Sequence, residues 1–328
     1  MMFQRLLLVW LTAFSALAFF WPTLFASVAD PFGKEAGDYY LKWLIVVTMF
    51  AIGLLLPRAE VNQVFRRWPM VLAGTCVQYS VMPLVAFLAA TIGGFEGSLF
   101  IGIVVVGCVP GAMASNVLTL NAKGNTSYSV SLTTMATLLS PLAVPLVLGL
   151  ALASEESVSR EKLIDASRFL LLTVVVPVVV GHLIGRLTTK WEKSLRRWSE
   201  LVANIAILWI IAAVVGRSRE PLSKMHVEVV FALLAVNIAG YFAGYGSGVA
   251  FRLPEPMRRA LTLEVGMQNA GLGAALAVAL FPDQPGIAVA PAIYTFGCML
   301  TGTALATTWS IMPPRGIGVA SNWHPDGE

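Results

Sequence analysis

Long apolar stretches alternate with short polar connections along this chain, and that alternation constrains the fold more than any other feature. A helix needs about 20 apolar residues to cross a hydrocarbon layer of ~30 Å. Ten stretches of roughly this length cover residues 6–26, 40–57, 69–92, 98–120, 127–153, 168–185, 199–216, 228–251, 260–281 and 287–312. We therefore predict an all-α integral membrane protein with ten transmembrane helices in a lipid bilayer and no separate soluble domain.

The charged residues support this prediction. Only 12% of the 328 residues are charged, whereas an average soluble domain has about 25%. The net charge of +4 comes from basic residues in the connections, which is typical of membrane loops and not of a nucleic-acid surface. The three cysteines lie in apolar stretches at wide spacings, so they indicate packing residues and neither a disulfide framework nor a zinc site.

The distribution of Lys and Arg predicts the orientation in an inner membrane. With ten spans, 14 basic residues lie on the side that holds both termini and 7 on the other side, which places the termini and the tail 313–328 in the cytoplasm. The first stretch also has features of a cleaved signal peptide, because Arg5 precedes it and Ser27-Val28-Ala29 follows it. Its length, Trp10 and Trp21 favour a retained helix.

Two of the stretches carry helix-breaking and polar residues at mid-membrane depth. One runs from Gly107 through Pro110 to Asn116, and the other from Glu264 to Gly273. If the chain is divided into 1–153 and 154–312, each of these stretches is the fourth of five spans in its half. Because each half has an odd number of spans, the second half inserts into the membrane with the opposite orientation. This pattern predicts two inverted five-helix repeats with a substrate site at their broken helices. The alternative is that the glycines only allow close helix packing.

Glu264 needs a partner because a carboxylate in mid-span costs on the order of 2.5–3.5 kcal/mol. No Lys or Arg lies deep in any predicted span, unless Lys42 reaches inward, so a proton or a metal cation remains. Neutral oxygens that suit a hard cation come from Gln78, Ser115, Asn116, Ser129, Thr133 and Gln268. A single carboxylate favours Na⁺ over Ca²⁺. Ser129 and Thr133 also have a structural explanation, a bond to the carbonyl one turn earlier.

The second halves of the broken helices point free N–H groups and positive dipole ends at the break, which attracts an anion. A cation site beside such helix ends is what a sodium-coupled carrier of organic anions needs.

Three runs of residues resemble the bile acid:sodium symporter family. They are Val106-Gly107-Cys108-Val109-Pro110-Gly111 continuing to Ala114-Ser115-Asn116-Val117, Lys123-Gly124-Asn125 continuing to Ser129-Val130, and Leu263-Glu264-Val265-Gly266-Met267-Gln268-Asn269. The resemblance covers approximately residues 3–312. It implies a panel domain of spans 1, 2, 6 and 7 and a core domain of spans 3–5 and 8–10 that holds the crossed, discontinuous spans 4 and 9.

The resemblance also implies two sodium ions. The first would be bound by Ser115, Asn116, Ser129, Thr133 and Glu264. The second would be bound by Gln78, Glu264, Gln268 and the carbonyls of Val265 and Met267. The substrate would lie against Asn116 and Asn269, with Met113 and Cys298 at positions where similar members often carry polar residues. Those departures put a bile acid or pantoate substrate in doubt.

The sequence therefore predicts symport of a small organic anion with two Na⁺ by alternating access, in a protein that is not an enzyme and is a monomer. Two alternatives remain open: proton coupling through Glu264, or a receptor that transports nothing. An enzyme with Cys108 or Ser115 as nucleophile would need a buried base, and the three histidines lie near span ends or in the tail.

Overall fold

The computed structural model describes residues 7–56, 68–155, 158–187, 192–224 and 227–314. Apart from turns and one isolated antiparallel bridge, regular structure in these ranges is helical. The longer helices are α2 (Leu7–Leu24), α3 (Lys34–Leu55), α5 (Trp68–Ile92), α8 (Thr126–Ala151), α11 (Glu192–Arg217), α13 (Val227–Ala250) and α16 (Val289–Ile311). The shorter elements are α6 (Gly97–Cys108), α7 (Ala114–Asn121), α9 (Arg160–Leu170), η1 (Leu171–Val175), α10 (Val176–Leu187), α12 (Arg219–Ser223), α14 (Glu255–Gly266), α15 (Ala270–Leu280) and η3 (Pro285–Ala288).

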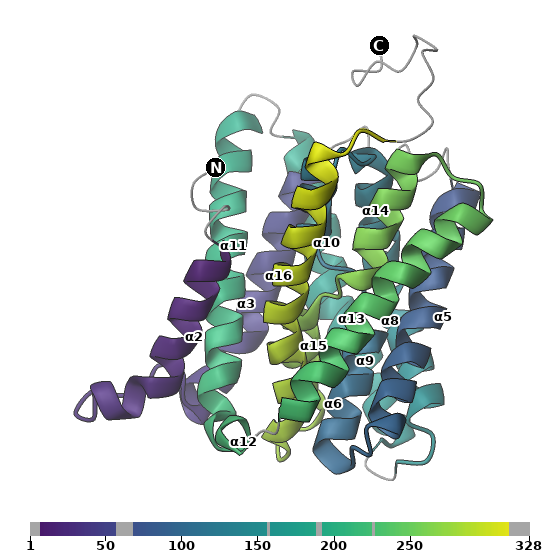
Figure 1. Ribbon diagram of the computed structural model, residues 1–328. Coiled ribbons are helices and arrows are strands. Elements are labelled where there is room, and N and C mark those ends of the chain that lie inside the picture. Colours follow the sequence, from purple (N-terminus) through teal and green to yellow (C-terminus); the bar gives the residue numbers. More distant parts are fainter. Residues whose placement is uncertain (1–6, 57–67, 156–157, 188–191, 225–226, 315–328) are drawn as a thin grey trace.

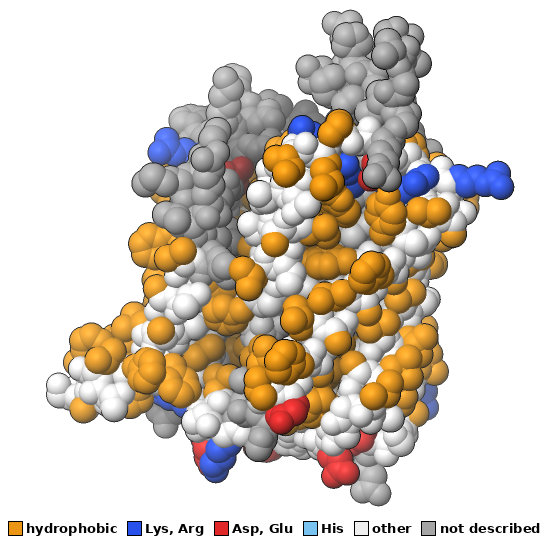
Figure 2. All heavy atoms as spheres, in the orientation of Figure 1, with side chains coloured by type: hydrophobic (Ala, Val, Ile, Leu, Met, Phe, Trp, Pro, Cys, Tyr) orange, Lys and Arg blue, Asp and Glu red, His pale blue; other side chains and the backbone are white. Residues whose placement is uncertain are grey.

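The surface of the bundle is apolar around its middle. Within the described ranges, six helical segments are long and apolar enough to cross a membrane, and four shorter helices are also apolar. Large side chains such as Phe242 and Leu150 are exposed on them. Figure 2 shows hydrophobic side chains over the visible face and charged ones gathered at its two ends. This distribution matches a protein whose middle faces lipid.

Several helices begin earlier than the predicted apolar stretches. α3 starts at Lys34 and not at 40, and α9 starts at Arg160 and not at 168. The first turns of these helices are polar, and hydropathy alone misses polar turns. The start of α9 is marked by Ser159, whose side chain accepts a hydrogen bond from the N–H of Lys162, as N-cap residues do.

Two groups of neighbouring helices can be distinguished, and α9 connects them by packing on α8. α3 contacts α10 and α11, and α11 contacts α2; elsewhere, α5 contacts α6, α8 and α13, and α13 contacts α14 and α16. Figure 1 shows α2, α3 and α11 on one side of the bundle and α5, α8 and α13 on the other. α13 approaches α14 closely through Gly240 and Gly244, since a Cβ at Gly244 would lie 2.8 Å from the Leu261 carbonyl oxygen.

Arg219 completes a helix that a proline interrupts. Pro22 lies inside α2 and has no N–H to donate to the carbonyl of Ala18, four residues earlier. Instead, Nε and Nη2 of Arg219 donate to that carbonyl, Nε at 3.0 Å, and Nη1 lies 2.5 Å from Oδ2 of Asp30. One guanidinium therefore joins α2, the α2–α3 connection and α12.

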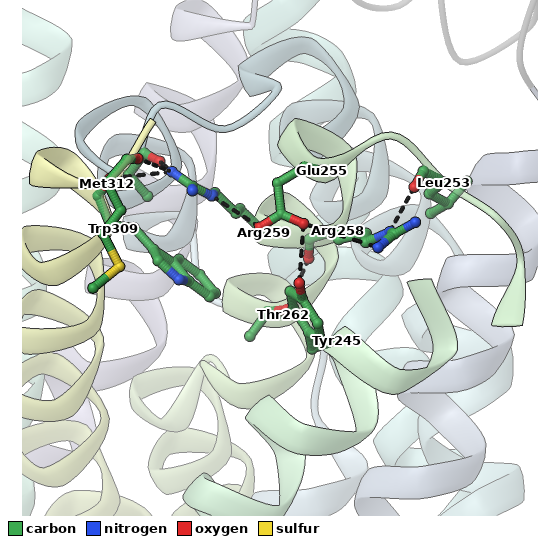
Figure 3. A network of polar contacts seen from close by, with 9 residues as sticks. Tyr245, Leu253, Glu255, Arg258, Arg259, Thr262, Trp309 and Met312 are labelled. Carbon is green, nitrogen blue, oxygen red and sulfur yellow. Dashed lines mark hydrogen bonds and ion pairs between the residues drawn. The ribbon is translucent and has the colours of Figure 1, made fainter. Parts of the chain in front are cut away.

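Arg259 and Glu255, which precede the predicted stretch 260–281, are buried within the bundle. α14 begins at Glu255, and Arg259 is only 2% exposed. Its Nε lies 3.3 Å from Glu255 Oε1, and its Nη1 donates to three carbonyls at the ends of α7 and α16, those of Ala122, Trp309 and Met312. Figure 3 shows this cluster, in which Glu255 also accepts from Tyr245 at 3.0 Å.

Candidate functional site

Two helix breaks meet inside the bundle. Helix stops at Cys108 and resumes at Ala114, and it stops again at Gly266 and resumes at Ala270, so both predicted interruptions are present. The intervening segments run antiparallel: the N–H of Ala112 donates to the Met267 carbonyl at 2.7 Å, and the N–H of Asn269 donates to the Pro110 carbonyl at 2.8 Å. Each break thereby satisfies backbone groups of the other, away from water.

Glu264 lies beside this crossing and is 1% exposed. Its Oε2 accepts hydrogen bonds from Ser115 Oγ at 2.6 Å and from Thr133 Oγ1 at 2.7 Å. Its Oε1 is buried and has no hydrogen-bond partner among the residues that the structure describes. Lys42, the basic residue considered from the sequence, is exposed on α3. A buried oxygen without a donor is expensive in an apolar interior, and this one is available to a cation.

The oxygens predicted for the first ion lie together. Asn116 Oδ1 accepts from Ser129 Oγ at 2.8 Å and lies 3.3 Å from Thr133 Oγ1. Thr133 Oγ1 also lies 3.1 Å from the carbonyl of Ser129, so the bond to the carbonyl one turn earlier is present for Thr133, whereas the Ser129 hydroxyl donates to Asn116. The structure thus brings Ser115, Asn116, Ser129, Thr133 and Glu264 into one cluster built from α7, α8 and α14.

The residues predicted for the second ion are also near one another. Gln78 and Gln268 are each 1% exposed, and Gln78 Nε2 lies 3.4 Å from Gln268 Oε1. Gln268 Nε2 donates to the Val265 carbonyl at 2.7 Å, and the Met267 carbonyl accepts from Ala112. A carbonyl has two lone pairs, so each of these oxygens keeps acceptor capacity for a cation.

The predicted substrate residues are more scattered. Met113 and Asn116 are in contact, with Asn116 Nδ2 3.9 Å from the Met113 sulfur. Asn269 caps α15 by accepting from the N–H of Leu272 at 3.1 Å. Cys298 is 2% exposed, and its thiol donates a hydrogen bond to the Thr295 carbonyl of its own helix at 3.5 Å. The described hydrogen bonds join Cys298 to neither asparagine.

Two site residues were not predicted. Thr119 is buried, with Oγ1 3.3 Å from Ser129 Oγ; it lies four residues after Ser115, one turn along the same helix face, and that spacing was a usable signal. A Cβ at Gly111 would lie 2.1 Å from Glu264 Oε1, so the carboxylate fits only because residue 111 has no side chain. No sequence pattern shows a close approach of that kind.

The arrangement is a set of hard oxygens around one carboxylate, supplied by hydroxyl, amide and carbonyl groups. Such ligands suit Na⁺ and not a soft transition metal. The ligands come from both broken helices, so a cation bound here would hold the two breaks together. The helix beginnings at Ala114 and Ala270 direct their dipoles toward the same region.

Several proteins named as sodium transporters are similar in sequence to this chain. The profile of the Sodium Bile acid symporter family matches residues 43–225. The "Uncharacterized sodium-dependent transporter YocS" of Bacillus subtilis (strain 168) is 34% identical over 302 residues, 92% of this chain and 90% of the relative. The "Probable sodium/metabolite cotransporter BASS1, chloroplastic" of Arabidopsis thaliana is 28% identical over 279 residues, 83% of this chain and 68% of the relative. The "Sodium/bile acid cotransporter 4" of Mus musculus is 26% identical over 245 residues, 73% of this chain and 56% of the relative.

The family is one of membrane transporters and not of enzymes. Together, the profile match, the Bacillus relative and the apolar helices show that this multi-pass membrane protein belongs to the sodium bile acid symporter family.

Proposed function

We propose that the protein is a sodium-driven symporter of a small organic anion, and that it works by alternating access with two Na⁺ per substrate. The observation that carries the proposal is the buried Oε1 of Glu264, which lies at the crossing of two broken helices and has no hydrogen-bond partner within the described part of the chain. A bound Na⁺ would supply the positive partner that this carboxylate oxygen lacks. The Bacillus relative is named as a sodium-dependent transporter and the Arabidopsis relative as a probable sodium/metabolite cotransporter, and both names support the same conclusion.

The proposed architecture has ten spans in two inverted repeats, with both termini in the cytoplasm. The panel consists of α2, α3, α9 to α10 and α11, and the core of α5 to α8 and α13 to α16. The contacts of α3 with α10 and α11, and those of α13 with α5, α14 and α16, support this division. Movement of the panel against the core would expose the crossing to each side of the membrane in turn.

Coupling follows from the shared position of the sites. Two Na⁺ neutralise Glu264 and fix both breaks, and the helix beginnings at Ala114 and Ala270 then receive the carboxylate of the substrate near Asn116 and Asn269. The anion binds well only to the sodium-loaded protein, so the coupling is a difference in affinity.

The test is thermal unfolding of the purified protein in Na⁺ against K⁺ at fixed pH and ionic strength. A ligand at ten times its Kd stabilises the folded state by about 1.4 kcal/mol, so Na⁺ should raise the melting temperature and K⁺ should not. Glu264→Gln should abolish the response. The matched control is Glu220→Gln, because Glu220 is an exposed carboxylate paired with Lys224 on α12. A melting temperature that changes with pH but not with Na⁺ would contradict sodium coupling and support proton coupling through Glu264.

Transport itself is tested in proteoliposomes. An inward Na⁺ gradient should drive uptake of those carboxylates that add stability in sodium buffer, and counterflow should occur with the same compounds. A protein that binds such a compound without counterflow is a receptor, and that result would overturn the proposal.

A further inference from the structure

The last carbonyl of α14 is held by two side chains that neither proposed sodium site includes. α14 ends at Gly266, so its carbonyl has lost the N–H that a continuing helix would supply. Asn237 Nδ2 on α13 and the Tyr294 hydroxyl on α16 each donate to this oxygen at 2.7 Å. Both side chains are 1% exposed, so water does not substitute for them.

A third residue orients the asparagine. Thr301 Oγ1 on α16 lies 2.6 Å from Asn237 Oδ1, and an amide oxygen only accepts, so the threonine hydroxyl donates. The Gly266 carbonyl only accepts, so the amide atom that faces it is Nδ2, and the bond from Thr301 to Oδ1 holds the amide in this orientation. Tyr241, whose hydroxyl lies 3.1 Å from Thr301 Oγ1, extends the chain of hydrogen bonds. Such chains strengthen one another in a low-dielectric interior.

Three successive carbonyls at this break face three different partners. The Val265 carbonyl accepts from Gln268, the Gly266 carbonyl from Asn237 and Tyr294, and the Met267 carbonyl from Ala112 of the other break. Met267 has an extended conformation, with φ −110° and ψ 93°. Fixing the middle carbonyl on α13 and α16 fixes the peptide plane between Gly266 and Met267, so the two neighbouring planes can turn only about φ and ψ of these residues.

We propose that Asn237 and Tyr294 are positioning residues of the sodium site. By holding the Gly266 carbonyl against α13 and α16, they keep the carbonyls of Val265 and Met267 directed at the crossing, where the second ion binds. This inference rests on the proposed function. It adds that sodium affinity depends on two residues that contact no ion.

The experiment compares two single-atom deletions in the full-length protein. Tyr294→Phe removes the hydroxyl that reaches Gly266. Tyr79→Phe is the matched control, because Tyr79 is also a buried tyrosine and its hydroxyl donates to the carbonyl of Ala136 in an intact helix at 2.8 Å. For each protein, the Na⁺ concentration that gives half of the maximal thermal stabilisation is measured, together with the melting temperature in K⁺.

Loss of one hydrogen bond should raise the half-maximal Na⁺ concentration about fivefold for Tyr294→Phe. Tyr79→Phe should leave it unchanged, even if both variants melt earlier in K⁺. A lower melting temperature without a change in Na⁺ concentration would assign Tyr294 to stability alone and overturn the inference. If the unaltered protein itself shows no Na⁺ response, the proposed function fails first, and the two failures are thereby distinguished.

Thr301 offers a second comparison in case Tyr294→Phe does not fold. Thr301→Val removes the donor to Asn237 and should weaken Na⁺ binding, whereas Thr301→Ser keeps a hydroxyl and should restore it. Equal Na⁺ responses of the valine and serine variants would contradict the positioning of Asn237.

Discussion

The candidate site requires a glycine at position 111, because any side chain there would occupy the space of the Glu264 carboxylate. Because a Cβ there would lie 2.1 Å from Glu264 Oε1 and 2.7 Å from its carboxyl carbon, Gly111→Ala must displace the carboxylate. We expect the Na⁺-dependent rise in melting temperature to be lost.

The control for this variant is Gly246→Ala on α13, where a Cβ would meet no atom within 4 Å. Replacement of a helical glycine by alanine stabilises by up to about 1 kcal/mol, so the control should melt no earlier and keep its Na⁺ response. Retained sodium stabilisation in Gly111→Ala would remove Glu264 from the site.

Asp30 should make stability depend on pH in the acid range. Burial alone raises the pKa of Asp30, but the hydrogen bond from Arg219, the N–H groups of Phe32 and Gly33 and the charge of Arg219 outweigh it, so the pKa is lowered. A lowered pKa adds stability above the unfolded value, and this contribution is lost as pH falls below about 4. The melting temperatures of the unaltered protein and of Asp30→Asn should therefore differ at pH 7 and converge in acid. A constant difference would contradict the ion pair.

The polar members of the site could be predicted residue by residue. Glu264, Ser115 and Thr133 each interrupt an apolar stretch, and a buried polar group requires a partner or a ligand. The roles of Gly111 and Tyr294 could not be predicted, because they depend on distances between segments more than 150 residues apart or on the direction of one carbonyl. Polarity patterns record neither.

At the scale of helices, α14 is anchored at the end opposite its break. Arg259 joins the start of α14 to the ends of α7 and α16, and its charge faces Glu255. Arg259→Ala would leave the buried Glu255 with Arg258, 4.0 Å away, as its remaining cation, and would remove the guanidinium donor from the carbonyls of Ala122 and Met312, a change that costs about 3–5 kcal/mol. Thermal unfolding in K⁺ should show a large loss of stability.

Arg258→Ala is the control for Arg259→Ala. The Arg258 side chain is 29% exposed, lies 4.0 Å from Glu255 and donates to the Leu253 carbonyl. Its loss should cost about 1 kcal/mol. Equal losses of stability in the two variants would show that the burial of Arg259 does not increase its contribution to the stability of the fold.

The existence of the helices was more predictable than their ends. Apolar length predicts that a segment crosses a membrane, and each predicted stretch contains helix in the described residues, although several helices extend beyond it. The polar first turns of α3, α9 and α14 carry no hydropathy signal, so the predicted stretch began at 260, just after Arg259. Its burial depends on carbonyls of α7 and α16, which lie far away in the sequence.

For the whole molecule, the charge of the proposed centre predicts electrogenic transport. The empty carrier keeps the negative charge of Glu264, whereas two Na⁺ and a monoanion make the loaded centre neutral. One net positive charge then crosses per cycle, and 100 mV, worth about 2.3 kcal/mol per charge, should change accumulation about 40-fold. Uptake into proteoliposomes with imposed K⁺ diffusion potentials measures this. Substrate accumulation that does not change with the membrane potential would contradict the two-sodium stoichiometry for a monoanion.

Helical class and membrane location could be predicted from the whole sequence, because they follow from summed apolar length and the scarcity of charge. The grouping of helices into panel and core came only from the resemblance to a family. Helix contacts such as those of α3 with α10 and α11 depend on complementary surfaces, which apolar patterns do not specify.

The mutual hydrogen bonds of the two breaks also bear on how the chain is made. Pro110 emerges from the ribosome 159 residues before Asn269, its partner, an interval of roughly 10 to 30 s at ordinary rates of synthesis. During that time the exposed backbone of the first break cannot rest in lipid, so water or the insertion machinery must shelter it. A nascent chain stopped before Asn269 should therefore remain at the insertion site and not enter the bilayer.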